Sequence, residues 1–238
     1  MRLRTAATRS AMDAGDEAGE EGVMILPAGY SDDARALWDA ATALNRAAAA
    51  VSPRAAALPP LLFFTDPERT PRPWETAARL PSGSAVIYRA FGAEDAVQTG
   101  LRLRQATAEA GVRLLIGRDA DLASAVKADG LHLPEREADR AANIRAEHPG
   151  WLLTAAWHGA GSPLTDNLDA LILSPVFPAG GASAAKPALG VTAFQDRVRS
   201  VAAPVYALGG VRPLNAGQLL GSGACGLAGV DAVQSAFR

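Results

Sequence analysis

The sequence predicts an α/β protein, a (β/α)8 TIM barrel with an extra helix before it. Eight short apolar runs recur between residues 61 and 230, and segments with helical character lie between most of them. The runs are continuously apolar and do not alternate with polar residues, which is typical of parallel strands covered on both faces. Interleaved strands and helices over this length favour a closed barrel. A doubly wound open sheet is the alternative.

Length and composition favour either one large domain or one domain with an extension. The chain has 238 residues, of which 49% are hydrophobic and 20% charged. Its formal net charge of −2 gives no electrostatic footprint for nucleic acid. No apolar run approaches the roughly 18 residues that cross a bilayer. The single Cys225 excludes an internal disulfide and fits a reducing compartment. We therefore expect a soluble cytoplasmic protein without nucleic-acid or membrane partners.

The N-terminal tail starts basic and then turns acidic without an apolar stretch. A signal peptide needs an apolar centre and a transit peptide avoids acids, so we expect a disordered tail over residues 1–30. Translation from Met1 and translation from Met24 are both compatible with this pattern.

A helix is expected over residues 31–50, before the barrel. Ser31 is a candidate N-cap, and Leu37, Trp38 and Leu44 share one apolar face. That face can cap the N-terminal end of the barrel or pack against its side. The expected organisation is a tail over 1–30, a helix and linker over 31–58, and a barrel domain over 59–238.

The barrel elements follow in order along the chain. The expected strands cover residues 61–65, 85–89, 113–117, 130–133, 152–157, 170–174, 205–209 and 226–230. Helical segments are expected over residues 94–110, 119–128, 137–148, 191–201 and 212–223. The connection after the fifth strand is short, so a reduced helix is expected there. Active sites of such barrels lie at the C-terminal ends of the strands.

Glycines end the last two strands. Gly209 and Gly210 follow the seventh strand, and Gly229 and Val230 end the eighth. Barrels often bind phosphate at these two loops, because glycine lets the backbone N–H groups approach an anion closely. The alternative is that the glycines only permit tight turns. We favour a phosphate site.

Two further side chains at strand ends are candidates for chemistry. His158 follows the fifth strand, where it can transfer a proton near neutral pH or pack as a structural residue. Arg89 ends the second strand, where it can hold a phosphate or form a salt bridge at the rim. His132 lies inside the fourth strand and is expected to be a hydrogen-bonded core residue.

Three collinear motifs resemble one known family. They are LLIGRDADLASAVKADGLHLPE, SPVFP and PVYALGGVRPLNAGQLLGSGACGLAGV. Together they make residues 60–235 similar to the thiamine phosphate synthase / TenI superfamily, as a divergent member. The resemblance implies a (β/α)8 barrel of thiamine biosynthesis. Synthases of the family join a pyrimidine pyrophosphate to a thiazole phosphate with Mg²⁺. TenI-type tautomerases move a proton on a thiazole carboxylate phosphate without a metal.

The residues that the synthase reaction needs are mostly replaced. In the family pattern Gln-x-Arg-x-Lys after the second strand, Arg89 matches the arginine but Ile87 and Phe91 replace the other two residues. Neither of the family's two metal-binding aspartates is retained. Asp119 lies one position after the first of them, and Glu137 occupies the second, so these two carboxylates are the weak candidates for a metal.

The pyrophosphate-binding run Thr-x-Thr-Lys of the sixth loop is also lost, and falls on Ala179, Gly181 and Ala182. Lys186 lies downstream as a possible substitute cation. With so few side chains that can grip a ligand, residues 174–190 are expected to form a mobile lid over a smaller substrate.

The thiazole-phosphate positions are retained. Gly209, Gly210 and Val230 match the family's phosphate loops, and His158 matches the histidine placed for proton transfer in TenI-type tautomerases. Asp231 replaces a family serine, and its charge is unfavourable near a phosphate unless it points away.

Three functions remain as hypotheses. The first is an enzyme acting on a thiazole phosphate by TenI-like proton transfer, with no cofactor. The second is a thiamine phosphate synthase with a rebuilt site, which would require Mg²⁺. The third is a non-catalytic binder or regulator that keeps only the phosphate site. All three imply a small phosphorylated thiazole or thiamine-related ligand, and a homo-oligomer is possible.

Overall fold

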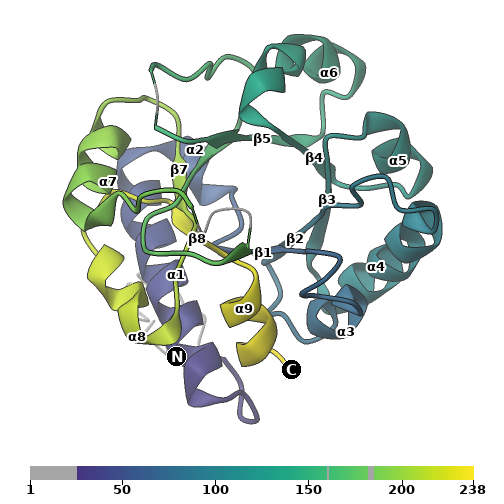
Figure 1. The fold of residues 1–238 in the computed structure, drawn as a ribbon, viewed down its shortest axis with the longest axis horizontal. Coiled ribbons are helices and arrows are strands. Elements are labelled where there is room, and N and C mark those ends of the chain that lie inside the picture. The colour runs from purple at the N-terminus through teal and green to yellow at the C-terminus, as the bar shows by residue number, and fades with distance from the viewer. Residues whose placement is uncertain (1–25, 160, 182–184) are drawn as a thin grey trace, which may run out of the picture.

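The computed structural model describes residues 26–159, 161–181 and 185–238. Its strands form a closed parallel barrel in sequence order, in which the last strand pairs with the first (Figure 1). This confirms the (β/α)8 prediction and rules out the open sheet. The strands are β1 (Leu61–Phe64), β2 (Ala85–Tyr88), β3 (Arg113–Gly117), β4 (Gly130–Leu133), β5 (Leu152–Trp157), β6 (Ala170–Leu173), β7 (Val205–Ala207) and β8 (Gly226–Gly229).

Helices surround the ring of strands (Figure 1). They are α1 (Asp32–Val51), α2 (Pro53–Ala56), α3 (Pro73–Ala77), α4 (Ala96–Ala110), α5 (Ala120–Ala125), α6 (Ala141–Glu147), α7 (Gly190–Arg199), α8 (Pro213–Ala216) and α9 (Asp231–Ala236), with 3-10 turns η1 (Glu135–Arg140) and η3 (Gly217–Leu219). Between β5 and β6 the described residues, 158–159 and 161–169, contain no helix. The sequence predicts a shortened helix in this connection, and the described residues have none. None of the described helices is both long and apolar enough to span a membrane.

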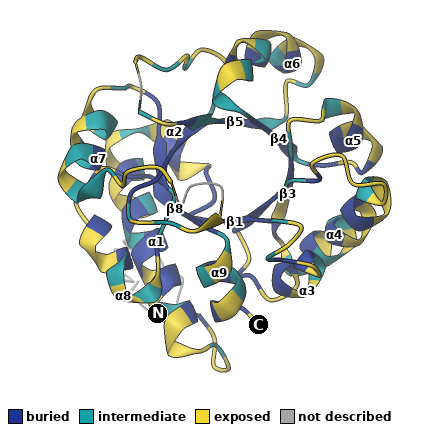
Figure 2. Cartoon of the chain, viewed as in Figure 1, coloured by how far each residue is buried: buried dark blue, intermediate teal, exposed yellow. Residues whose placement is uncertain are grey.

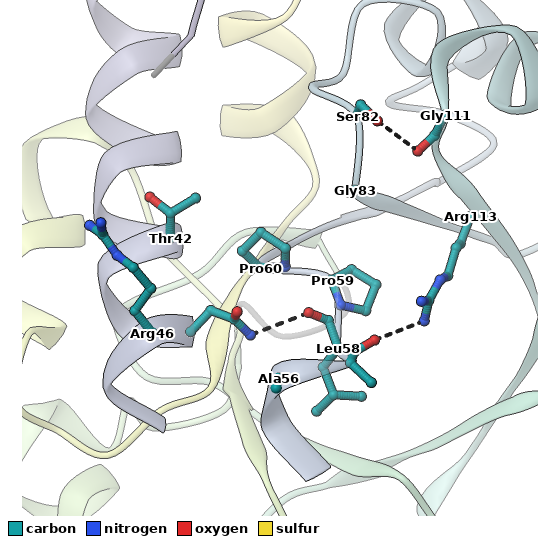
Figure 3. Close-up of a pocket in the computed structure, with 12 residues that line it drawn as sticks. Thr42, Arg46, Ala56, Leu58, Pro59, Pro60, Ser82, Gly83, Gly111 and Arg113 are labelled. Carbon is teal, nitrogen blue, oxygen red and sulfur yellow. Dashed lines mark hydrogen bonds between the residues drawn. The ribbon is translucent and has the colours of Figure 1, made fainter. Parts of the chain in front are cut away.

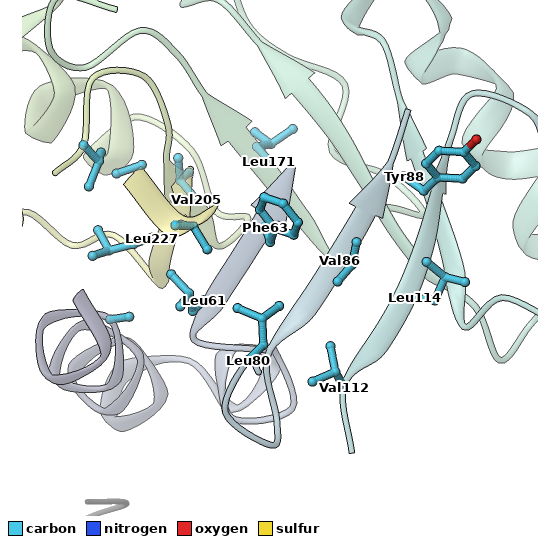
Figure 4. Close-up of a cluster of buried hydrophobic side chains, with 14 of the residues drawn as sticks. Leu61, Phe63, Leu80, Val86, Tyr88, Val112, Leu114, Leu171, Val205 and Leu227 are labelled. Atoms are coloured by element: carbon cyan, nitrogen blue, oxygen red, sulfur yellow. The ribbon is translucent and has the colours of Figure 1, made fainter. Parts of the chain in front are cut away.

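The strands are buried on both faces, as their continuous apolar runs predict (Figure 2). Alternate residues of β1 show this best. Leu61 and Phe63 belong to the outer core, which packs against the helices (Figure 4). Leu62 and Phe64 belong to the inner core, which fills the barrel. The barrel is therefore a packed core and leaves room for a ligand only beyond the strand ends.

Helix α1 packs on the side of the barrel, next to α8, α9 and β8 (Figure 1). Ser31 caps it, since its hydroxyl accepts a hydrogen bond from the N–H of Ala34 at 3.1 Å. Further along the helix, the Asn45 amide donates to the carbonyls of Leu58 at 3.2 Å and Cys225 at 3.2 Å. These bonds fix the helix against the start of β8. Of the two positions that the sequence allows, the side position is therefore the correct one.

The segment between α1 and β1 closes the N-terminal end of the barrel. Helix α2 starts with Pro53, a residue favoured in the first turn of a helix. Ala55 and Leu58 are buried with the inner core. The hydroxyl of Tyr206 donates to the carbonyl of Pro59 at 2.6 Å, which ties the segment to β7. The linker expected from the sequence thus contains a helix and forms part of the core.

A cavity of about 460 Å³ lies at this N-terminal end (Figure 3). It is bounded by α1, the segment before β1 and the start of β3, and the Arg113 guanidinium at its edge donates to the carbonyl of Ala57 at 3.0 Å. Active sites of such barrels lie at the opposite, C-terminal end of the strands, so this cavity is not the candidate functional site.

Candidate functional site

A cavity of about 200 Å³ opens at the C-terminal ends of the strands. The loops after β1, β2, β6, β7 and β8 border it, and five residues predicted from the sequence to bind phosphate or substrate line it: Arg89, Gly209, Gly210, Gly229 and Val230. The fold therefore brings two separate glycine loops and one strand-end arginine to the same hollow.

The backbone after β7 needs glycine for packing reasons. Gly209 and Gly210 both have positive φ, 97° and 65°. A Cβ on Gly209 would lie 2.7 Å from the Cα of Pro175, and one on Gly210 would overlap the carbonyl oxygen of Pro178. Neither glycine donates its N–H to another described residue. Packing is sufficient to explain why both positions are glycine. The two N–H groups are nevertheless without a described partner, so they remain available to an anion.

Arg89 is held at the rim of the cavity by backbone contacts. Its Nε donates to the carbonyl of Thr65 at 2.7 Å, and its guanidinium lies over the rings of Phe64 and Phe91. Among the described residues Nη2 is buried without a hydrogen-bond partner, and Oδ2 of Asp66 lies 3.7 Å away. Burial lowers the pKa of Arg89, and the charge of Asp66 partly offsets this effect. A buried donor without a partner is suited to an anionic ligand.

The loop after β1 adds a second guanidinium that the sequence motifs do not include. Arg69 contacts Oδ2 of Asp66 at 3.0 Å and Oδ2 of Asp231 at 2.9 Å. The pKa of Asp66 is lowered, chiefly by its hydrogen bond with Arg69. The charge of Asp231, which is unfavourable near a phosphate, is balanced by its ion pair with Arg69. The position of the stretch TDPERT directly after a strand was the signal in the sequence that could have identified Arg69.

His158 lies beside the cavity and contacts Ser174, a residue that lines it. Its Nδ1 is 3.3 Å from the carbonyl oxygen of Ser174 and 3.4 Å from the hydroxyl, and Ser174 lines the cavity. Its Nε2 is 3.4 Å from Nζ of Lys186. Because a carbonyl oxygen can only accept, a hydrogen bond to it requires the proton on Nδ1, and in the neutral ring this leaves the electron pair on Nε2. The register of the sixth loop gave no reason to expect Lys186 here.

The two carboxylates considered for a metal have other partners. Oδ1 of Asp119 accepts from the N–H of Leu122 at 2.8 Å and caps α5. Glu137 contacts three arginines, among them Arg118 at 2.9 Å and Arg140 at 2.8 Å. Within the described ranges no group of three or more His, Cys, Asp or Glu side chains is gathered in a way that could hold a metal ion.

The loop after β6 is anchored at both ends. Phe177 donates its N–H to the carbonyl of Gly209 at 3.0 Å, and the N–H of Gly190 reaches the carbonyl of Val176 at 2.9 Å. Residues 182–184, the middle of the expected lid, lie outside the described part of the chain. The lid therefore stays a prediction.

His132 is a core residue, as expected, and lies inside the barrel below the cavity. Its side chain is buried, Nδ1 is 2.9 Å from the Thr154 hydroxyl, and its ring meets Phe64 edge to face. Burial, together with the positive charge of Arg89, lowers its pKa from 6.5 to about 3. The imidazole is therefore neutral in the folded protein at neutral pH.

This lowered pKa predicts an acid-sensitive stability. In the unfolded chain His132 binds a proton below pH 6.5, whereas in the folded chain it does so only near pH 3. Its contribution to stability is complete above pH 6.5 and decreases as the pH falls, by up to about 1.4 kcal/mol per pH unit. Urea unfolding of wild type and His132→Gln between pH 7 and pH 5 measures this. We expect a flatter pH dependence in the variant, and equal slopes would refute the assignment.

A model of one protein family, described as thiamine monophosphate synthase, matches residues 61–233. This match covers most of the chain, including all eight strands. The chain belongs to the thiamine monophosphate synthase / TenI family. Helices α1 and α2 lie outside the part that the family model matches, although both pack against the barrel.

Individual members of the family agree with this assignment. A thiamine-phosphate synthase of Limosilactobacillus fermentum is 33% identical over 171 residues, which cover 67% of this chain and 79% of that protein. One of Methanoculleus marisnigri is 28% identical over 142 residues, 58% of this chain and 67% of that protein. A solved structure of thiamine phosphate pyrophosphorylase from Pyrococcus furiosus has a TM-score of 0.62 at 24% identity, covering 74% of this chain and 91% of that one. This structural likeness shows the shared fold.

Proposed function

We propose that this member of the thiamine monophosphate synthase / TenI family is an enzyme of thiamine biosynthesis that transfers a proton on a thiazole phosphate. The observation that carries the proposal is the fixed orientation of His158. Its Nδ1–H points to the Ser174 carbonyl, and Ser174 lines the cavity bounded by the glycine loops. The proposed base and the proposed anion site are therefore adjacent.

The ligand's phosphate is placed between the two glycine loops. The N–H groups of Gly209 and Gly210 supply donors on one side, and Gly229 and Val230 border the other side. Backbone donors in a tight turn suit phosphate oxygens because no side chain separates them from the anion. Holding the phosphate at this end directs the thiazole ring toward Ser174 and His158.

His158 then moves the proton. The free electron pair of Nε2 accepts a proton from one position of the ring system, and the imidazolium returns it to another, so no co-reactant is needed. The Ser174 carbonyl stabilises the imidazolium by continuing to accept from Nδ1–H. Lys186 lies 3.4 Å from Nε2 and must give way to the substrate, after which its ammonium group remains near the carboxylate of a thiazole carboxylate.

The donors at the aligned metal positions favour this reaction over a magnesium-dependent one. Mg²⁺ binds carboxylates in an octahedral arrangement and loses its waters reluctantly. Asp119 caps a helix, and Glu137 is ion-paired with arginines, so these two side chains fit Mg²⁺ poorly. The family's Mg²⁺-dependent chemistry is therefore not assigned to them.

A second candidate is the synthase reaction with a rebuilt site. The buried Nη2 of Arg89 and the ammonium group of Lys186 are cationic donors that can face a pyrophosphate. The two relatives compared above are thiamine-phosphate synthases. This candidate requires Mg²⁺ to be bound through the substrate's phosphates.

Ligand-dependent thermal unfolding separates the candidates. We expect thiazole phosphate alone to raise the melting temperature, and pyrophosphate with Mg²⁺ to have no effect. Solvent-deuterium incorporation into a thiazole carboxylate phosphate, followed by mass spectrometry, then tests the proton transfer. Stabilisation by pyrophosphate with Mg²⁺, together with release of pyrophosphate from the pyrimidine substrate, would instead establish the synthase.

A further inference from the structure

Arg69 is fixed over the cavity by a loop that is folded onto itself. Oδ1 of Asp66 accepts from the N–H groups of Glu68 and Arg69, both at 3.2 Å. The Thr70 hydroxyl accepts from the N–H of Asp66 at 2.7 Å and donates to its carbonyl at 2.8 Å. The Arg69 side chain therefore starts from a well-defined backbone position and lines the cavity together with the two glycine loops.

The guanidinium of Arg69 is held by two carboxylates that differ in character. Asp66 belongs to the same loop, whereas Asp231 starts α9 and its side chain is 60% exposed. Ion pairs with exposed partners contribute little to stability, about 0–1 kcal/mol. The Arg69–Asp231 contact is thus one that a better anion can replace, while the contact with Asp66 keeps the guanidinium in place.

The charges around the cavity match a phosphate dianion. Three guanidinium groups line it, those of Arg69, Arg89 and Arg212, against two carboxylates, those of Asp66 and Asp231, which leaves a formal charge of +1. When Asp231 turns away, this charge becomes +2. A phosphate monoester carries up to two negative charges and offers several oxygens to the planar guanidinium.

We propose that Arg69 is a phosphate-binding residue of this site and that Asp231 is a resident counterion, which the ligand's phosphate displaces. The ligand class is a phosphate monoester, and its identity as a thiazole phosphate rests on the proposed function. Arg69 then supplies part of the positive charge that the alanines and glycines of the sixth loop cannot supply. Gly181 of that loop packs on the guanidinium, since a Cβ there would lie 3.1 Å from Cζ of Arg69.

Titration calorimetry with inorganic phosphate and with thiazole phosphate tests the role of Arg69. Arg69→Gln should raise both dissociation constants about 10- to 100-fold, the range expected for losing hydrogen bonds to a charged group. Arg72→Gln is the matched control. Arg72 lies in the same connection and is ion-paired with Glu75 at 2.9 Å, but its side chain is 68% exposed and does not line the cavity. We expect the control to bind both ligands like wild type.

Replacing Asp231 tests the displacement. Asp231→Asn removes the competing charge, so phosphate should bind severalfold more tightly when Arg69 is present. In an Arg69→Gln background the same replacement should give a smaller gain, because the competition for the guanidinium no longer exists. Equal gains in both backgrounds would show that Asp231 acts only through general repulsion and would overturn its role as a counterion.

The outcomes also separate this proposal from the function on which it rests. If thiazole phosphate binds wild type and Arg69→Gln equally, Arg69 is not a ligand, while the proposed function stands. If inorganic phosphate binds in an Arg69-dependent way but thiazole phosphate does not bind, Arg69 is an anion ligand and the proposed function is wrong. If neither ligand binds wild type, both are wrong.

Discussion

His158→Ala should decrease turnover of a thiazole carboxylate phosphate by about 10²- to 10⁴-fold, the range of a lost general base. Binding of thiazole phosphate should change little, because the phosphate loops are left intact. The physical reason is that Nε2 carries the only free electron pair of the imidazole once Nδ1–H is committed to the Ser174 carbonyl. Single-turnover kinetics together with calorimetry separate the chemical step from binding.

His148→Ala serves as the matched control for this variant. His148 is the C-cap residue after α6, and its ring stacks on Trp151 at a centroid distance of 3.7 Å, away from the cavity. Turnover of the control should equal that of wild type. If His158→Ala also keeps wild-type turnover, proton transfer by His158 is refuted, and the phosphate site needs another partner for chemistry.

Trp38→Ala should lower the free energy of unfolding by about 3–5 kcal/mol, as for other large aromatic residues removed from a core. Trp38 is 1% exposed and belongs to the same core as the outer faces of the strands. The predicted loss is large because α1 packs against β8 and α8 as an integral layer of the barrel. Urea unfolding followed by circular dichroism measures it.

Leu214→Ala is the control for this second variant, since Leu214 in α8 is 96% exposed. Its free energy of unfolding should stay within about 0.5 kcal/mol of wild type, as for most surface substitutions. An arbitrary point mutation typically lowers the free energy of unfolding by about 1 kcal/mol. If Trp38→Ala lowers it by less than this, α1 is not an integral part of the barrel.

The barrel could be predicted because its strands carry a strong local signal. Runs such as LLFF and ALIL are buried at every position, and the observed strand ends differ from the expected ones by at most two residues. The short helices α2, α3 and α9 escaped prediction, because four to six residues give too few turns to show helical spacing. Their presence depends on packing against the barrel, which no local pattern records.

The candidate site was predictable only in part. Strand ends identified Arg89 and the glycine loops, since the C-terminal edge of a barrel follows from strand order alone. Arg69 was not predicted because none of the motifs covers the loop after β1, and its ion pair with Asp231 joins residues 162 positions apart. The contact between Lys186 and His158 depends on the path of a long loop, which residue spacing does not determine.

The position of α1 has a consequence for biosynthesis. Ser31 donates to the carbonyl of Ala236, and Tyr30 meets Phe237 edge to face, so the first helix is joined to the last one. A ribosome releases α1 early but releases β8 and α9 only after the intervening barrel has been translated. Translation proceeds at about 5–20 residues per second, so the apolar face of α1 stays exposed for on the order of ten seconds before β8 and α9 are available to cover it. We expect chaperones to bind the exposed helix during this interval, and pulse-labelled ribosome complexes should show them bound until the last strand emerges.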